Sequence, residues 1–143
     1  MLSEKVGGSS GSANMKLIDT DIAIDHFHGH QSALDYFTET LAAGEILAVA
    51  VVTLTELLSG MRSGVEDRTE RLMQLFVRLD VDETIARKAG EYLREYRSSH
   101  RIELGDALIA ATAVFHDAEI ITRNIKHYPM HDVRILSTYT RGR

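Results

Sequence analysis

The chain has 143 residues, which suits one domain large enough to bury a hydrophobic core. Its 44% hydrophobic and 26% charged residues exclude a fibrous or low-complexity chain, and the absence of cysteine excludes disulfides and thiolate metal sites and fits a reducing cytoplasm. The formal net charge of −5 argues against a general affinity for nucleic acid, because phosphate binding depends mainly on Lys and Arg.

Residues 1–14 differ in composition from the rest of the chain. They contain the segment GGSSGS, which is typical of flexible linkers, so we expect a tag-like or disordered leader. Residues 15–143 should form a single domain with Met15 as its natural start. No apolar run reaches the ~18 residues needed to span a bilayer, so we expect no membrane partner.

Five short apolar runs predict strands. They lie at 16–19, 46–52, 77–81, 119–122 and 133–136. The second run, ILAVAVV, is continuously apolar rather than alternating, which predicts a strand that is covered on both faces.

The stretches between these runs predict helices, at 31–43, 53–62, 66–76, 82–98 and 105–116. The first is followed by Gly44, a usual residue just past a helix end. The last is apolar nearly all round, which predicts a buried central helix. Strands that alternate with helices favour a three-layer α/β fold, with a mainly parallel five-stranded sheet flanked by helices.

Three acidic residues fall at junctions of the predicted elements. Asp19 ends the first strand, Glu56 falls in the first turn after the second strand, and Asp106 opens the apolar helix. Each has a structural explanation. Asp19 can cap a helix, Glu56 can complete a capping box that begins at Thr53, and Asp106 suits the positive end of a helix dipole.

The same three acids together favour a metal site. Ligands of open parallel sheets bind at the carboxyl ends of the strands, so we expect Asp19 and Glu56 at that edge, joined by Asp106 if its helix starts there. None has a Lys or Arg beside it in sequence, and a cluster of repelling carboxylates either titrates or binds a cation. Oxygen ligands favour Mg²⁺ or Mn²⁺ over zinc.

Three segments carry a resemblance to a known family: LIDTDIAID, VTLTELLSGM and ELGDALIAATAVFHDAEIITRNIKHY. They resemble the PIN-domain ribonucleases, and among these the VapC-type toxins of toxin–antitoxin pairs. The resemblance covers about residues 15–138. It implies Mg²⁺- or Mn²⁺-dependent hydrolysis of RNA, neutralisation by a cognate antitoxin protein, and a homodimer.

The resemblance also implies roles for individual residues. It places the family's three metal-binding acids at Asp19, Glu56 and Asp106, and a further catalytic position at Asn124. Thr20 and Thr122 correspond to hydroxyl residues that orient waters or carboxylates around the metal ligands.

Basic residues supply the candidates for contacts with substrate phosphates. Arg123 and Lys126 are preferred because they flank Asn124. Further candidates are Arg62, Arg68, Arg71, Arg94, Arg97 and Arg101, although a solvated charged surface explains these equally well.

This chain departs from the family pattern at three positions. Many members have Asn where this chain has Asp21, which adds a negative charge that lies either near the site or facing away from it. Asn124 stands where many members have a fourth acid, which puts a tightly held second metal ion in doubt. Asp117 stands where a glycine often ends the helix.

Several other residues have no assigned role. They are Glu103, which precedes Asp106 by one turn, and His26, His28 and His30 in the segment HFHGH, whose spacing is poor for a metal site on a helix. Asp25 is expected on the surface, because carboxylates are rarely buried.

The motifs leave two other functions open. The segments DTD and LGDAL imitate elements of the haloacid-dehalogenase-like phosphatases, although the later elements occur in a different order. A PIN-type module that binds RNA or a protein partner without cleavage is the second alternative.

Overall fold

The computed structural model describes residues 14–137, so the predicted leader lies, apart from Asn14, outside the described residues, as do residues 138–143. Within the described part, a five-stranded sheet has the order β4-β3-β2-β5-β6, and every strand pair is parallel. The strands are β2 (Met15–Ile18), β3 (Ile46–Ala50), β4 (Val77–Leu79), β5 (Glu119–Ile121) and β6 (Arg134–Leu136). The prediction of a mainly parallel five-stranded sheet is confirmed.

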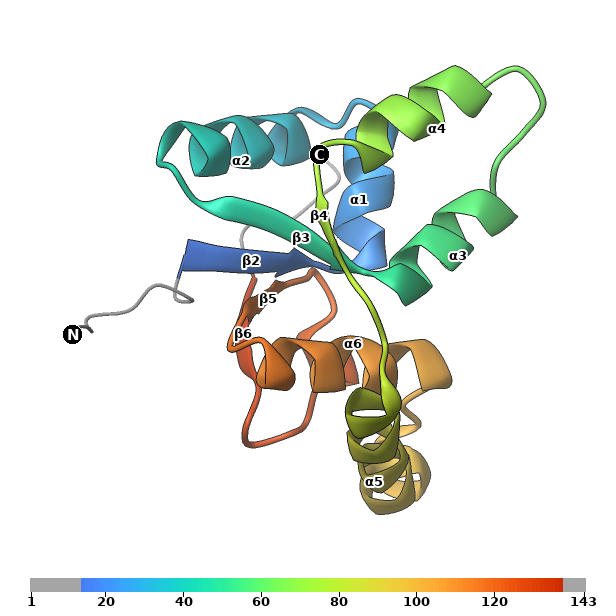
Figure 1. Cartoon of the computed structure of the whole chain (residues 1–143), viewed down its shortest axis with the longest axis vertical. Coiled ribbons are helices and arrows are strands. Elements are labelled where there is room, and N and C mark those ends of the chain that lie inside the picture. The colour runs from blue at the N-terminus through green and yellow to red at the C-terminus, as the bar shows by residue number, and fades with distance from the viewer. Residues whose placement is uncertain (1–13, 138–143) are drawn as a thin grey trace.

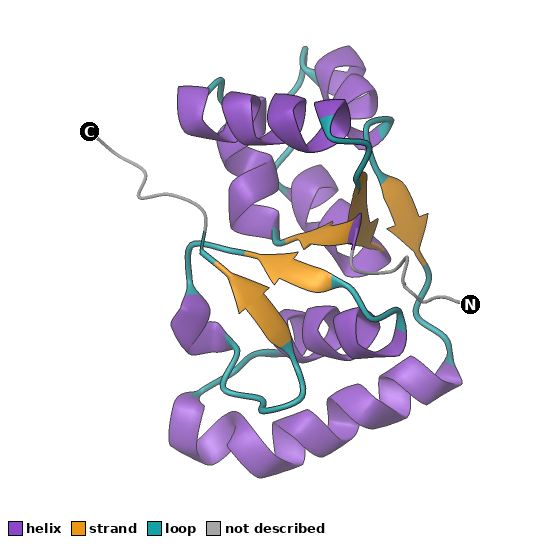
Figure 2. Ribbon diagram, turned by 90° about the vertical axis from the view of Figure 1, so that its left-hand side faces the viewer, coloured by secondary structure: helices purple, strands orange, loops and turns teal. Residues whose placement is uncertain are grey.

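Helices cover both faces of this sheet and produce the expected three layers (Figures 1 and 2). They are α1 (Thr20–Phe27), α2 (Gln31–Ala42), α3 (Val51–Ser59), α4 (Glu66–Met73), α5 (Glu83–His100) and α6 (Leu104–Phe115). Helices α1 to α4 contribute to one hydrophobic core, and α5 and α6 contribute to the other. A short 3-10 helix, η2 (Ile125–His127), follows β5.

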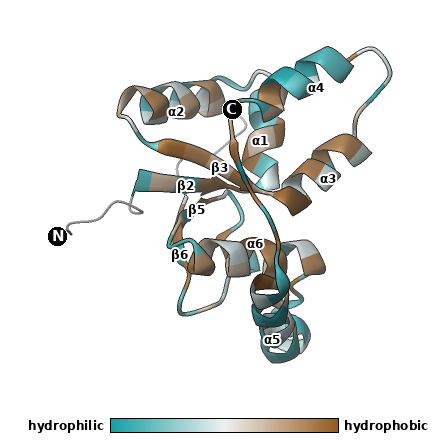
Figure 3. Ribbon diagram, viewed as in Figure 1, coloured by the Kyte–Doolittle hydropathy of each residue, from teal (hydrophilic) through white to brown (hydrophobic). Residues whose placement is uncertain are grey.

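The central strands contribute alternate side chains to the two cores. Leu47 and Val49 of β3 pack with α1, α2 and α4, whereas Ala48 and Ala50 pack with α5 and α6. All four side chains are buried, which confirms the prediction that this strand is covered on both faces. Figure 3 shows β3 as strongly hydrophobic, while the outer helices α4 and α5 are largely hydrophilic.

The helix ends follow local chemistry in most places. Gly44 has φ +79°, a left-handed conformation that glycine adopts without strain, and α2 ends just before it as predicted. Asp117 also has a positive φ, of 53°, just after α6, a backbone conformation that glycine would adopt without strain. Within residues 14–137, no helix combines the length and apolar character needed to cross a membrane.

Several predicted boundaries are off by two or three residues, and one of these shifts has a consequence for Glu56. Strand β3 ends at Ala50 and α3 begins at Val51, two residues earlier than expected, with Ala50 as N-cap and no side-chain capping bond. Thr53 therefore lies inside the helix, and the predicted capping box between Thr53 and Glu56 does not form. The apolar run extended past the strand because Val51 and Val52 are half-buried at the start of α3.

Candidate active site

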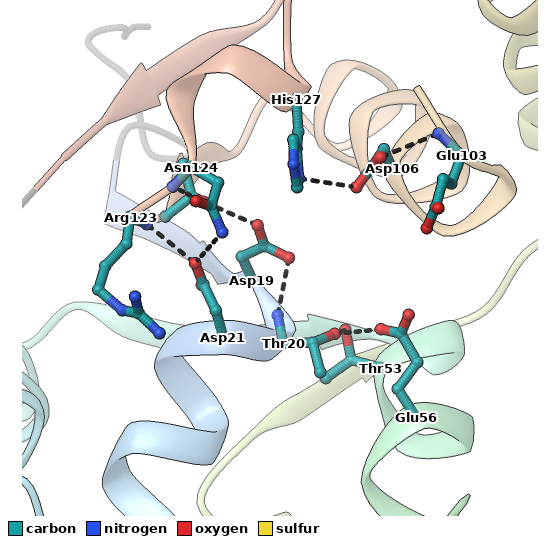
Figure 4. Close-up of polar contacts among 11 residues, drawn as sticks. Asp19, Thr20, Asp21, Thr53, Glu56, Glu103, Asp106, Arg123, Asn124 and His127 are labelled. Carbon is teal, nitrogen blue, oxygen red and sulfur yellow. Dashed lines mark hydrogen bonds and ion pairs between the residues drawn. The ribbon is translucent and has the colours of Figure 1, made fainter. Parts of the chain in front are cut away.

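Polar side chains from four segments gather at the carboxyl ends of β2, β3 and β5 (Figure 4). Asp19 and Asp21 come from the junction of β2 and α1, and Glu56 from the helix after β3. Asp106 comes from the first turn of α6, and Asn124 and His127 follow β5. Parallel strands place these junctions at one edge of the sheet, where open α/β sheets bind ligands.

Asp19 is both a helix cap and the central acid of this group. Its Oδ1 accepts a hydrogen bond from the backbone N–H of Thr20 (2.8 Å), and its Oδ2 accepts one from the hydroxyl of Thr122 (2.7 Å). The residue is only 7% exposed. The expected N-cap is confirmed, and the second bond fixes the carboxylate between β2 and β5.

Glu56 is exposed in the middle of α3 and reaches back to α1 rather than to its own helix. The hydroxyl of Thr20 donates a hydrogen bond to Oε1 of Glu56 and lies 3.1 Å from the hydroxyl of buried Thr53. Thr20 therefore joins two of the predicted site segments. The sequence predicts Thr53 only as a cap. Because α3 begins two residues early, Thr53 lies inside the helix and contacts the hydroxyl of Thr20 instead.

Asp106 occupies the third position of α6. Its Oδ2 accepts the backbone N–H of Glu103 (3.0 Å), and its Oδ1 lies 3.5 Å from Nδ1 of His127. Burial raises the pKa of Asp106, and the charges of Asp19 and Glu103 add to this, while the Glu103 N–H and His127 oppose it. The predicted place of Asp106 in the first turn of this helix is confirmed, and its bond to the Glu103 N–H completes a capping box that the sequence analysis did not predict. His127 is a neighbour that the sequence analysis did not identify, although it follows Asn124 by only three residues.

Asp21 and Asn124, two of the positions at which the chain departs from the family pattern, are neighbours in space. Oδ2 of Asp21 accepts hydrogen bonds from the Asn124 side chain (3.0 Å) and the Arg123 backbone N–H (3.2 Å), so Asp21 lies at the site. Its Oδ1 is buried and has no hydrogen-bond partner among the described residues. Burial, together with the charge of Asp19, raises the pKa of Asp21 to about 6.

Tyr128 is a further residue that the sequence analysis missed. Its side chain is 3% exposed, and burial together with the charges of Asp19 and Asp106 raises the pKa of its hydroxyl. The hydroxyl therefore remains protonated beside the carboxylates. No local sequence signal marks it, because its place depends on the path of the chain after η2.

The prediction that Asp25 is a surface residue is wrong. Asp25 is fully buried in α1, and one of its carboxylate oxygens lies 2.8 Å from Nε of Arg123. A buried carboxylate is tolerated when it is paired and hydrogen-bonded, and Arg123 provides such a partner. The guanidinium that had been a candidate for substrate phosphate is thus engaged behind the site.

The remaining candidates lie at the edge of the site or away from it. Lys126 is exposed on η2, and Glu103 is exposed at the N-cap of α6. His26 stacks on Phe37, with ring centroids 4.4 Å apart, and burial lowers its pKa. This packing gives His26 a structural role within HFHGH. Arg62, Arg68, Arg71, Arg94, Arg97 and Arg101 are all exposed.

The residues at this edge fit a hard divalent cation by their chemistry. In the conformation described, no three His, Asp or Glu side chains of residues 14–137 are arranged to hold an ion, so shared ligation requires side-chain movement. The donors are carboxylate oxygens, as Mg²⁺ and Mn²⁺ prefer, and one buried oxygen of Asp21 has no partner within the same residues. A Cβ at Gly105 would lie 3.1 Å from Oε2 of Glu56, so the glycine leaves room for this carboxylate to approach α6.

Comparison with known proteins places residues 16–131 in the family described as PIN domain. Ribonuclease VapC19 of Mycobacterium tuberculosis is 44% identical over 117 residues, which cover 81% of this chain and 94% of that protein. Ribonuclease VapC10 of the same organism is 42% identical over 119 residues, covering 82% and 89%. A toxin–antitoxin complex from Klebsiella pneumoniae has a TM-score of 0.69 at 28% identity, over 87% of this chain and 98% of its own.

Proposed function

This chain belongs to the PIN domain family, and we infer from its relatives that it is a VapC-type ribonuclease that acts as the toxin of a toxin–antitoxin pair. The phosphatase alternative is set aside, because the family that matches the chain is that of the PIN domain. The observation that supports the enzymatic proposal is that Asp19, Glu56 and Asp106 lie at one edge of the sheet. There the carboxylate of Glu56 lies beside both the hydroxyl of Thr20 and Gly105 of α6.

We propose that Asp19, Glu56 and Asp106 hold Mg²⁺ or Mn²⁺, with Asp21 beside them. When bound, the ion would acidify a water and stabilise the negative charge on the departing oxygen of a phosphodiester. Burial, together with the charge of Asp19, raises the pKa values of Asp21 and Asp106, and the charge of a bound cation would offset that of these acids so that an RNA phosphate can approach an acidic protein.

The surrounding residues orient these carboxylates. The hydroxyl of Thr122 holds Asp19, and the hydroxyl of Thr20 holds Glu56 in its present rotamer. The side-chain amide of Asn124 donates to Oδ2 of Asp21, whereas Oδ1 of Asp21 has no hydrogen-bond partner among the described residues. Such partners commonly fix the geometry of metal ligands. Lys126 is exposed nearby in sequence and remains our candidate for a phosphate contact.

Gly105→Ala should lower the rate of RNA cleavage by about tenfold, because misplacing a catalytic group by ~1 Å can cost about 100-fold. The new Cβ would displace the Glu56 carboxylate from its approach to α6. Stability should not fall, since Ala exceeds Gly in helix propensity by up to about 1 kcal/mol. Cleavage assays and thermal melts measure both effects.

Gly90→Ala is the matched control for this substitution. A Cβ at Gly90, in α5, would meet no heavy atom within 4 Å, so this variant should gain helix stability and cleave at the wild-type rate. Wild-type cleavage by Gly105→Ala would show that the glycine does not shape the position of Glu56.

We also propose the partners of the family: a cognate antitoxin, a second copy of the chain, and RNA in the cytoplasm. The purified chain should cleave RNA, and bound antitoxin from the same operon should suppress the cleavage. Light scattering of the free chain should give the mass of a dimer. An RNA-binding sample that never cleaves, under any cation, would instead support the non-catalytic alternative.

A further inference from the structure

We propose that the buried Asp25–Arg123 ion pair positions the loop that carries Thr122 and Asn124, so that Arg123 organises the site from behind rather than binding substrate phosphate. The inference rests on the proposed ribonuclease function and adds two positioning residues to it.

The geometry of the pair commits the guanidinium to α1. Nε of Arg123 lies 2.8 Å from Oδ2 of Asp25, and a second nitrogen, Nη2, lies 3.4 Å from Oδ1. The Asp25 side chain is 0% exposed and that of Arg123 is 26% exposed. Figure 4 shows the Arg123 side chain extending away from Asp106 and Glu56. Turning toward RNA would leave a buried carboxylate without this partner, which is strongly unfavourable.

The same loop is attached to α1 a second time, one helical turn earlier. The backbone N–H of Arg123 and the side chain of Asn124 both donate to Asp21, which precedes Asp25 by four residues and so lies on the same side of the helix. Asp21 and Asp25 of this helix thus bind the backbone N–H of Arg123 and the side chains of Arg123 and Asn124.

This attachment continues to the central acid of the site. The hydroxyl of Thr122 donates to Oδ2 of Asp19 (2.7 Å) and accepts the backbone N–H of Asn124 (2.9 Å). A loop released from α1 would carry this hydroxyl with it. The orientation of Asp19 therefore depends on a pair that touches neither Asp19 nor any substrate.

The chain contains a second ion pair that serves as a control. Lys16 and Glu119 join β2 and β5, the strands that precede α1 and this loop, through a 2.7 Å contact, and their side chains are 13% and 22% exposed. Asp19 and Thr122 follow the opposite ends of these strands. Breaking this pair removes an ion pair between the two strands without touching the loop.

The test compares Asp25→Asn and Arg123→Lys with the control Glu119→Gln. In the cation-free protein, the amides of Arg123 and Asn124 should exchange hydrogen at least about tenfold faster in the pair variants, because local opening becomes easier. Arg123→Lys keeps the positive charge and guards against loss of the fold.

Mn²⁺ affinity without RNA, and kcat, should each fall by about 10- to 100-fold, as for other groups that orient metal ligands. KM should stay within about twofold, because substrate contacts are retained. Glu119→Gln should leave all four quantities unchanged, at temperatures where every variant is folded.

Two results would overturn the proposal. A raised KM with unchanged kcat, Mn²⁺ affinity and exchange would make Arg123 a contact for substrate phosphate. Equal behaviour of the pair variants and Glu119→Gln would make the Asp25–Arg123 pair structural only. Failure of the wild-type chain to bind Mn²⁺ or cut RNA would count against the proposed function instead, while the exchange of the two amides would still decide whether the pair holds the loop.

Discussion

Removal of divalent cations with EDTA should abolish RNA cleavage by this protein, and excess Mg²⁺ or Mn²⁺ should restore it. The physical reason is the charge of the site. Burial, together with the charge of Asp19, raises the pKa values of Asp21 and Asp106, so these acids lie among like charges, and the guanidinium of Arg123 is engaged with Asp25 rather than with a phosphate. We expect a loss of about 100-fold or more, because a metal ion contributes several kcal/mol to the transition state.

Two measurements separate this effect from unfolding by the chelator. A time course of cleavage on labelled RNA gives the rate, and thermal melts with and without Mg²⁺ give the stability. The melting temperature should rise with Mg²⁺ and return to its starting value in EDTA, with the fold retained at the assay temperature. Undiminished cleavage in chelator would remove the metal from the proposed mechanism.

Glu56→Gln and Asp106→Asn should each reduce the cleavage rate by about 100-fold or more, because an amide supplies no negative charge to a cation. Both changes keep an oxygen where the carboxylate has one. The amide oxygen of the first variant can still accept from Thr20, and that of the second can still accept the Glu103 N–H. Stability without metal should therefore stay the same or rise by up to ~1 kcal/mol, since one of several repelling charges is lost.

Asp82→Asn is the matched control for these substitutions. Asp82 caps α5 by accepting the Ile85 N–H (2.9 Å), and Asn is as good an N-cap as Asp. This variant should match the wild type in melting temperature and in cleavage. If Glu56→Gln or Asp106→Asn melted well below the wild type in EDTA while still cutting RNA, their carboxylates would be structural rather than catalytic.

Local sequence patterns determined the main elements of this protein. Short apolar runs separated by helical periodicity predicted a parallel five-stranded sheet, and the continuous run of β3 predicted burial on both faces. Asp19 could be identified as a helix cap and Asp106 as a residue of a first helical turn, because such roles depend on residues one to three positions away. Parallel topology then implied that the junctions share one edge of the sheet.

The tertiary structure alone decided which polar groups meet there. Asp25 is buried, and Arg123 faces it rather than solvent, across a separation of 98 residues in sequence. Asp21 meets Asn124 across 103 residues, and Thr20 rather than Thr53 holds Glu56. None of these contacts leaves a local pattern, because each depends on which side of α1 faces the loop after β5 and on where α3 begins. Periodicity reports which residues share a face, whereas the partner of a buried charge is set by how the layers pack.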